Sequence, residues 1–222
     1  LMDASKLPAA FADAVSRIDY ASATAKINMA VSALPRFAGM PESTGVQAEH
    51  HGTIHIGHSL EGIERAYDDA KYGQISRTPL IEMTIPTALD QTLAPEGHHI
   101  VQLFVQYAPC HLADSSWDIE RDLLADTCLR EIDRYAPGFS RSVIHRQVLA
   151  PPDLERIYGL TGGNIFHGAM NPSQLFSLRP VAGWADHRPP IKGLYLCGAG
   201  THPGGGVTGL PGFLAAQAVL NS

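Results

Sequence analysis

The 222-residue sequence lacks several features that mark large classes of proteins. It has only three cysteines, Cys110, Cys128 and Cys197, and none lies in a CxxC or zinc-like spacing. A sparse, odd set of cysteines favours a reducing compartment, the cytoplasm or an organellar matrix, over secretion. No apolar run approaches the roughly 20 residues of a transmembrane helix, and no signal peptide follows Leu1.

Charge is scarce as well. Charged residues make up 17% of the sequence, and 22 acidic residues against 16 Lys and Arg give a formal charge of −6. Because the basic residues do not cluster, the electrostatic footprint of a nucleic-acid-binding protein is missing. Hydrophobic residues, at 45%, suffice for a sizeable core. The composition therefore indicates a globular protein with no nucleic-acid partner.

Two nucleotide-binding fingerprints are also missing. Gly198-Ala199-Gly200 is followed by Thr-His-Pro, so the third glycine of GxGxxG is absent, and the acidic residue expected about 20 positions later has no room. No GK[ST] triplet closes a P-loop, and no GxSxG elbow supports a Ser-His-Asp triad. We therefore expect neither a complete dinucleotide-binding unit nor a P-loop.

The predicted elements mix strands with helices. Apolar and polar residues alternate over 23–34, with Ile27 and Met29 on one face and Lys26 and Asn28 on the other, which predicts a half-buried strand. Further strands are predicted at 53–57, 80–87, 99–107, 142–149 and 193–198, and helices at 5–19, 60–72, 117–135, 151–158 and 213–220. This order predicts an α+β fold with a largely antiparallel or mixed sheet and packing helices.

Two predicted elements carry more detailed expectations. Ser115 and Asp118 resemble a capping box for helix 117–135. The buried stripe expected for that helix consists of Ile119, Leu123, Leu124, Cys128 and Ile132. The apolar face of strand 99–107, with Val101, Leu103, Val105 and Tyr107, is either a surface for a substrate or core beneath a helix.

The strongest chemical signal is the glycine-rich stretch 193–209, which precedes a helix of small residues. Glycines let a backbone approach a ligand without Cβ clashes, and a helix start offers unpaired N–H groups to electron-rich oxygens. The alternative is a strand–helix turn without a ligand. Because three consecutive glycines are costly in backbone entropy, the stretch favours a binding loop.

Residues 194–207 resemble the C-terminal flavin-binding signature of phytoene dehydrogenase-like, FAD-dependent oxidoreductases. Segments 24–28, 90–97 and 166–180 resemble the same family, so the resemblance covers nearly the whole chain. It implies that the loop and the following helix start close over the isoalloxazine and ribityl end of FAD. The cofactor-binding residues that it implies are Gly198, Ala199, Gly200, Thr201, His202, Pro203, Gly204, Gly205, Gly206 and Val207.

The resemblance also implies a division of labour. Residues 1–190 are expected to form a substrate-binding domain, and residues 191–222 a strand, glycine loop and helix of a Rossmann-like FAD domain. The family's N-terminal GxGxxG unit is missing, so we expect a C-terminal fragment that binds FAD weakly or not at all and is inactive alone. In the full protein, FAD would accept a hydride from a C–C or C–N bond of an apolar small molecule; we assign no catalytic base.

Other functions stay open at this point. A non-catalytic binding or assembly module, with self-association through an uncovered apolar face, is the main alternative, and a phosphate-binding module is another. Phe166 and His167 are substrate-lining candidates, although His167 also suits a plain loop histidine. His202 either touches the flavin or supports the loop backbone. Cys197 is expected in the core, and the cluster His50, His51, His55 and His58 is not expected to bind a metal.

Overall fold

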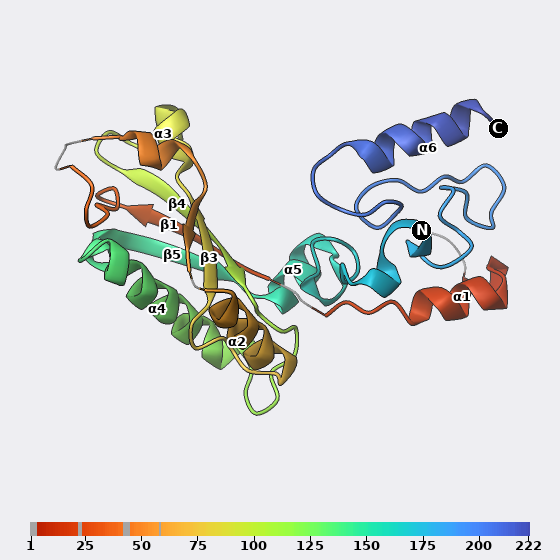
Figure 1. Ribbon diagram of the computed structural model, residues 1–222, viewed down its shortest axis with the longest axis horizontal. Helices are drawn as coiled ribbons and strands as arrows, with labels where there is room; N and C mark the ends of the chain where they lie inside the picture. Colours follow the sequence, from red (N-terminus) through yellow and green to blue (C-terminus); the bar gives the residue numbers. More distant parts are fainter. Residues whose placement is uncertain (1–3, 22–23, 42–44, 58) are drawn as a thin grey trace. The chain divides into compact units, whose positions relative to one another are not determined.

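The computed structural model describes residues 4–21, 24–41, 45–57 and 59–222. The chain divides into two compact units (Figure 1). One unit, here called the sheet unit, is the continuous segment Ser22–Gly163. The other, here called the loop unit, combines Leu1–Ala21 with Asn164–Ser222. The predicted functional division at residue 190 stays a prediction, since the geometric boundaries follow residues 21 and 163.

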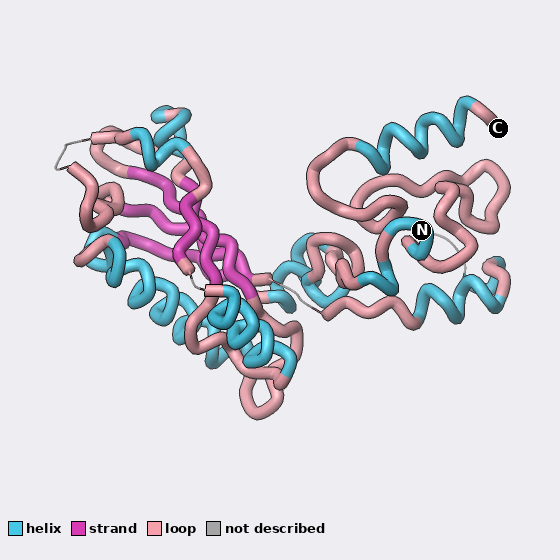
Figure 2. The backbone as a smooth tube through the Cα atoms, viewed as in Figure 1, coloured by secondary structure: helices cyan, strands magenta, loops and turns pink. Residues whose placement is uncertain are grey.

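The sheet unit contains a five-stranded antiparallel sheet of order β2-β3-β4-β1-β5 (Figure 2). Its strands are β1 (Ala25–Val31), β2 (Ile54–Ile56), β3 (Leu80–Thr84), β4 (His99–Gln106) and β5 (Val143–Leu149). The third residue of β1, Ile27, pairs with Leu103 on one side and Val148 on the other. The predicted α+β class with an antiparallel sheet is therefore confirmed.

Helix packing covers one face of this sheet, where α4 residues share a core with the strands. The helices of the sheet unit are α2 (Leu60–Lys71), α3 (Pro86–Leu89), α4 (Trp117–Tyr135) and α5 (Pro151–Tyr158). Burial alternates strictly along β1, as the sequence predicts. Ile27 and Leu103 are at most 1% exposed and share one core with Leu124, Cys128 and Ile132 of α4. Each such side chain contributes about 1.5–3 kcal/mol through burial.

Helix boundaries follow local chemistry in most cases. The Ser59 hydroxyl accepts the N–H of Gly62 at 3.3 Å, which confirms its predicted capping role for α2. Gly73 and Gly159, with φ of +74° and +69°, follow α2 and α5 in the left-handed conformation that glycine favours. The capping prediction for α4 is wrong: Ser116 is the N-cap and makes no side-chain cap, while Ser115 donates to Glu120 instead.

The predicted stripe of α4 is half right. Leu124, Cys128 and Ile132 are buried, but Ile119 is 72% exposed and Leu123 is 47% exposed. The buried stripe begins at Trp117, which is 5% exposed and recurs with the others at helical spacing. At 3.6 residues per turn, Ile119 and Leu123 lie on the side of α4 that faces away from that stripe, so their hydrophobicity misled the assignment.

The loop unit contains helices α1 (Ala9–Ser16) and α6 (Leu210–Leu220), joined through mostly irregular backbone with short 3-10 turns. The predicted strand at 193–198 is wrong, since residues 194–197 have no regular secondary structure and belong to no sheet. The described part of this unit contains no strand with which they could pair. The N–H of Leu196 instead donates to the backbone carbonyl of His187 at 2.9 Å. Cys197 is consequently exposed, which corrects its predicted place in the core.

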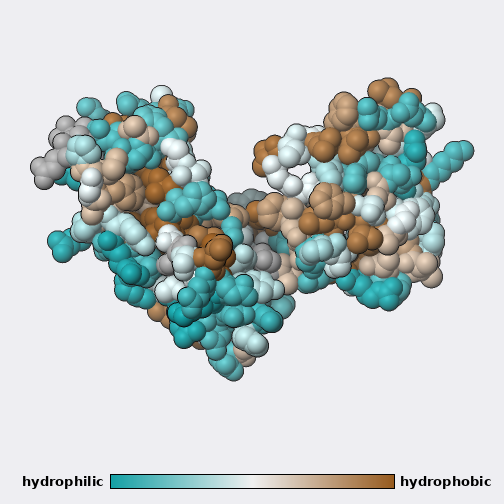
Figure 3. Space-filling model, viewed as in Figure 1, coloured by the Kyte–Doolittle hydropathy of each residue, from teal (hydrophilic) through white to brown (hydrophobic). Residues whose placement is uncertain are grey.

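Helix α6 is unusual for a surface helix because it is apolar on nearly all sides. Pro211 and Ala215 are buried, whereas Leu210, Phe213, Val219 and Leu220 are 41–83% exposed. Apolar residues accordingly reach the surface over α6 in the space-filling view (Figure 3). Each of the described helices is too short or too polar to cross a membrane.

Candidate functional site

The glycine-rich stretch forms an open loop that leads into α6. Gly204 and Gly206 have φ of +127° and +129°, a region that L side chains rarely adopt. Val207 also has a positive φ, +55°, and its side chain points fully into solvent. The loop therefore holds a backbone conformation that glycine makes accessible, with its outer edge uncovered.

The amides of this loop are the feature most suited to ligand binding. Within the described chain, no hydrogen bond is donated by the backbone N–H groups of residues 204–208. A Cβ on Gly206 would meet nothing closer than Thr208 Cγ2 at 3.8 Å, so this edge has free space. Consecutive unpaired N–H groups beside a helix start can bind oxyanions or an electron-rich ring edge.

The structure brings Phe166 and His167 to this loop. A Cβ on Gly205 would lie 2.3 Å from Cδ1 of Phe166, and a Cβ on Gly200 would lie 3.2 Å from Cβ of His167. Both candidate residues thus pack against the backbone of the predicted cofactor loop. Gly205 is required by contact with Phe166 inside the chain, whatever ligand the loop binds. The roles of both residues toward a substrate stay predictions.

His202 places a ring nitrogen without a hydrogen-bond partner in the described chain beside the glycine loop. Its Nδ1 atom is buried and has no hydrogen-bond partner among the described residues. The ring of His187 lies at 6.4 Å between centroids, edge to face. His187 donates from Nδ1 to the Leu196 carbonyl at 3.0 Å, and its Nε2 atom is buried without a partner in the described chain. Two imidazole nitrogens beside the loop are therefore available to a water or ligand atom.

Arg179 is the main residue whose importance the sequence patterns did not reveal. Its side chain is 2% exposed, and its guanidinium spreads over several backbone carbonyls. Nε donates to Ala199 at 2.7 Å, Nη1 to Gln174 at 3.0 Å and Ala169 at 3.3 Å, and Nη2 to Gly168 at 3.2 Å and to Phe166. Burial lowers the pKa of Arg179 from its ordinary value. Arg179 lies within segment 166–180, whose resemblance to the family was the only pointer in the sequence to this position.

Asn164 is a second buried polar residue that organises the site. Its Nδ2 donates to the carbonyls of Tyr20 and Ala21 at 3.3 and 3.0 Å, and its Oδ1 accepts the N–H of Phe166 at 2.9 Å. Asn164 is 2% exposed. It therefore joins two segments that are far apart in sequence and fixes the start of the Phe166–His167 turn. In the sequence, only the presence of an Asn in an irregular, glycine-rich segment points to this role.

The predicted substrate surface on β4 is wrong. Val101, Leu103 and Val105 are 0% exposed in the core that α4 covers, so packing beneath a helix is the correct interpretation. The opposite face of the sheet is less covered. There Lys26 donates to Gln102 at 3.3 Å, and burial lowers the pKa of Lys26.

The same open face carries a row of amides. Asn28 pairs in register with Gln102 of β4 and Gln147 of β5, and its Nδ2 donates to Gln147 at 3.3 Å. The Oδ1 atom of Asn28 is buried and has no partner in the described chain. Among the described residues, this face therefore holds a buried acceptor without a partner and a half-buried ammonium, beside the half-buried Ile100 and Phe104.

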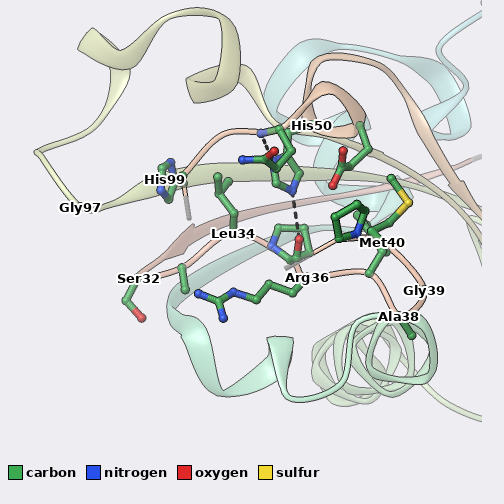
Figure 4. A pocket seen from close by; sticks show the side chains of 16 residues that line it. Ser32, Leu34, Arg36, Ala38, Gly39, Met40, His50, Gly97 and His99 are labelled. Carbon is green, nitrogen blue, oxygen red and sulfur yellow. Dashed lines mark hydrogen bonds between the residues drawn. The ribbon is translucent and has the colours of Figure 1, made fainter. Parts of the chain in front are cut away.

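The sheet unit also has a cavity of about 500 Å³ near the C-terminal end of β1 (Figure 4). His50 lies at its centre, with Nε2 donating to Pro35 and Nδ1 accepting the N–H of Gln47, both at 3.0 Å. Leu34, Arg36 and His99 also line it. None of the predicted site residues lines this cavity.

The histidine cluster offers no metal centre in the described part of the chain. No group of three or more His, Cys, Asp or Glu residues there is placed to hold an ion. His50 is engaged with backbone groups on both ring nitrogens. His58 lies outside the described residues.

Comparison with known proteins identifies relatives along nearly the whole chain. No protein-family model matches it. Pyridine nucleotide-disulfide oxidoreductase domain-containing protein 2 of Rattus norvegicus is 49% identical over 96% of this chain and 38% of that protein. A limonene dehydrogenase polypeptide of Castellaniella defragrans is 28% identical over 83% of the chain and 34% of that protein. Phytoene desaturase (lycopene-forming) of Pantoea ananas is 31% identical over 61% of the chain and 27% of that protein.

The relatives extend well beyond the matched region, because the chain spans 38% or less of each of these three proteins. Their names are those of an oxidoreductase-domain protein, a dehydrogenase and a desaturase. The match to the rat protein covers 96% of the chain and so includes the glycine loop. The chain is therefore similar, over most of its length, to part of pyridine nucleotide-disulfide oxidoreductase domain-containing protein 2 and, more distantly, to part of a phytoene desaturase.

Proposed function

We propose that this chain is the C-terminal portion of an FAD-dependent oxidoreductase, in which the loop Gly198–Val207 binds the cofactor. The observation that carries the proposal is the run of unpaired N–H groups at residues 204–208, beside the start of α6. The names of the relatives support redox chemistry. The substrate is an apolar small molecule, by analogy with limonene and phytoene in those names.

The loop's donor set fits a flavin. Its amides, the helix start and the free space beside Gly206 suit an electron-rich ring edge or ribityl oxygens. When bound, FAD supplies the hydride-accepting chemistry. The chain's own contribution is to orient the cofactor. Gly204 and Gly206 permit the path of the loop backbone, and Phe166 and His167 pack against that backbone. His202 offers its Nδ1 to the cofactor or to a water beside it.

The partner of this portion is the remaining part of an FAD domain. Helix α6 exposes Leu210, Phe213, Val219 and Leu220, and a helix that is apolar all round is normally buried in a larger core. The rat relative has further chain beyond the matched 38% of its length, which provides a source for such a core. We assign the GxGxxG unit that holds the ADP half of FAD to this additional chain.

The substrate surface is assigned to the open face of the sheet. Ile100 and Phe104 supply half-buried apolar area there, and the unpartnered Oδ1 of Asn28 supplies a polar anchor. Binding energy from such remote contacts can orient a substrate for hydride transfer. This assignment replaces the buried β4 face that the sequence suggested.

A complementation experiment tests the proposal. The chain is purified alone and as a fusion to the residues that precede the matched region in the rat relative, and flavin absorbance is measured per mole of protein. We expect little or no FAD in the chain alone and stoichiometric FAD in the fusion. Gly206→Val in the fusion should remove most of the flavin, whereas Gly39→Val, at a positive-φ glycine of the sheet unit, should not.

An assembly module is the competing function, and the exposed apolar residues of α6 favour it. A fusion that stays colourless in the presence of FAD, while the chain alone forms stable dimers that Phe213→Glu dissociates, would establish that function instead. Localisation in the cytoplasm or an organellar matrix belongs to the same proposal and rests on the sparse cysteines.

A further inference from the structure

Arg179 has the largest fully buried side chain of the described residues. Its guanidinium donates to five carbonyl oxygens, but no carboxylate in the described chain pairs with it. Most arginines that form ion pairs here do so at the surface, as Arg17, Arg65 and Arg134 do. Burial of a charge without a counter-ion costs free energy, so a buried, unpaired Arg179 indicates a specific role for this side chain.

The five acceptors belong to three separate pieces of the loop unit. Ala199 lies in the glycine loop, residues 166–169 form the turn of Phe166 and His167, and Gln174 ends a 3-10 turn. One planar side chain with five N–H donors therefore holds the loop against the residues that support it. Replacing Arg179 leaves buried carbonyls without donors, which loosens all three pieces together.

The charge itself also matters. Burial lowers the pKa of this guanidinium, but arginine starts from so high a value that it stays protonated at neutral pH. The positive charge is fixed in the interior of the loop unit, directly bonded to the loop that carries the unpaired amides. In a medium of reduced dielectric such a charge attracts a negative group more strongly than it would in water.

We propose that Arg179 is the positioning residue of the cofactor loop and that its unpaired charge selects a negatively charged or electron-rich group at the amides of residues 204–208. The inference deepens the proposed function, on which it rests for the identity of the ligand. It predicts a site tuned to an anion: the phosphate oxygens of a nucleotide or the electron-rich edge of a reduced flavin ring.

The positioning role is tested on the chain alone, without a cofactor. Amide hydrogen exchange is compared for the native chain, Arg179→Lys, Arg179→Met and the control Arg188→Met, whose arginine is 43% exposed and contacts Ala218 in the same unit. Both Arg179 variants should exchange at least about tenfold faster at His167, Ala169 and Thr201, whose N–H groups are bonded in the native chain. The strands of the sheet unit serve as the internal reference for folding.

The charge is tested by two further measurements. Titration with inorganic phosphate should give a dissociation constant about tenfold higher in Arg179→Met than in Arg179→Lys, because both variants loosen the loop but only Arg179→Lys keeps the charge. In the FAD-loaded fusion, Arg179→Met should lower the midpoint potential relative to Arg179→Lys, because a nearby positive charge favours the reduced, more negative flavin. If the charge affects phosphate affinity but leaves the flavin midpoint potential unchanged, the charge of Arg179 acts on phosphate oxygens and not on the flavin ring.

Specific outcomes separate the two proposals. Native exchange at residues 166–169 and 198–201 in both Arg179 variants would overturn the positioning role. Equal phosphate affinity and equal potential in Arg179→Met and Arg179→Lys would overturn the charge role. A fusion that never binds FAD, while the exchange and phosphate results hold, would overturn the flavin assignment and leave Arg179 as the organiser of an anion site.

Discussion

The buried residues of the sheet unit are mainly apolar and lie on regular strands and helices, whereas those of the loop unit include several large polar side chains. Ile27 and Leu103 represent the first kind, and Arg179 and Asn164 represent the second. In the sheet unit, burial of hydrocarbon specifies which residues meet. In the loop unit, a few side chains satisfy backbone groups of irregular segments, so hydrogen bonding specifies the conformation.

This contrast explains how the units differ in their need for a partner. The sheet unit has a core cluster that draws on all five strands and on α4, and its apolar face is covered. The loop unit leaves α6 and the edge of its glycine loop uncovered. We therefore expect the loop unit to gain more stability than the sheet unit when further chain is supplied, as in the rat fusion.

Two tryptophans allow the contrast to be measured. Trp117 belongs to the sheet unit, and Trp184 packs edge to face against Phe11 in the loop unit at 5.2 Å. In a Trp184→Phe background fluorescence reports on the sheet unit, and in a Trp117→Phe background it reports on the loop unit. Urea unfolding followed through each tryptophan gives a separate free energy of unfolding.

The largest effect is expected in the sheet core. Leu103→Ala should lower the free energy of unfolding reported by Trp117 by about 2–5 kcal/mol, because it leaves a cavity beside Ile27 and Met83. The signal of Trp184 should shift much less. Equal shifts of both signals would show that the units unfold as one, which would break the comparison.

The next effect concerns the packing of the glycine loop. Gly205→Ala should lower the stability reported by Trp184 by about 1–3 kcal/mol, since the added Cβ overlaps the ring of Phe166. The double variant Gly205→Ala, Phe166→Ala should regain part of this loss relative to the sum of the single variants. Strict additivity in this double-mutant cycle would contradict direct contact between the two residues.

A smaller, pH-dependent effect is expected at the start of α5. Burial opposes ionisation of Asp153, but hydrogen bonds from Ala150 and Arg156 and the charge of Arg121 outweigh it, so the pKa of Asp153 is lowered. The ionised form then stabilises the fold above about pH 4, the ordinary range of aspartate, and this contribution disappears as pH falls through the lowered value.

Asp153→Asn tests this contribution through Trp117. At pH 7 the variant should lose on the order of 1 kcal/mol, because the amide cannot replace the charge between Arg121 and Arg156. The difference between variant and native chain should shrink as the pH is lowered below about 4. A difference that is constant from neutral to acidic pH would mean that the charge of Asp153 contributes nothing.

The smallest effect sharpens the correction of the α4 stripe. Ile119→Ser should change stability by less than about 0.5 kcal/mol, because Ile119 is 72% exposed. Leu124→Ala on the same helix is the matched control and should cost about 2–5 kcal/mol, because Leu124 is fully buried. A large loss in Ile119→Ser would restore the stripe that the sequence suggested.

Prediction from sequence succeeded where periodicity reflects burial. The alternation in β1 correctly separated Ile27 from Lys26, and the limits of helix 117–135 match α4. Prediction failed where burial depends on whether a neighbouring strand is present. Residues 193–198 have the composition of a strand, but an extended segment becomes a strand only when another offers its backbone groups. The exposure of Cys197 follows from the same missing neighbour.

The candidate site was predictable only in part. The glycine loop and its neighbours Phe166 and His167 were identified from residue types and a family resemblance, and the structure places them in contact. Arg179 and Asn164 were not identified as site residues, because their roles depend on bonds to backbone carbonyls, which lie up to 20 positions away for Arg179 and up to 144 positions away for Asn164. Such partners carry no side-chain signature, so sequence patterns do not reveal them.

The division of the chain into one continuous and one split unit bears on how the protein is made. All strands of the sheet unit lie between residues 22 and 163, whereas the loop unit needs both ends of the chain. Because domains fold as they emerge from the ribosome, a nascent chain extended through Gly163 can already hold its sheet. Helix α1 must then wait for its partners beyond residue 163, such as Trp184, to be synthesised. The unpaired amides of residues 204–208 consequently form last, after the sheet is in place.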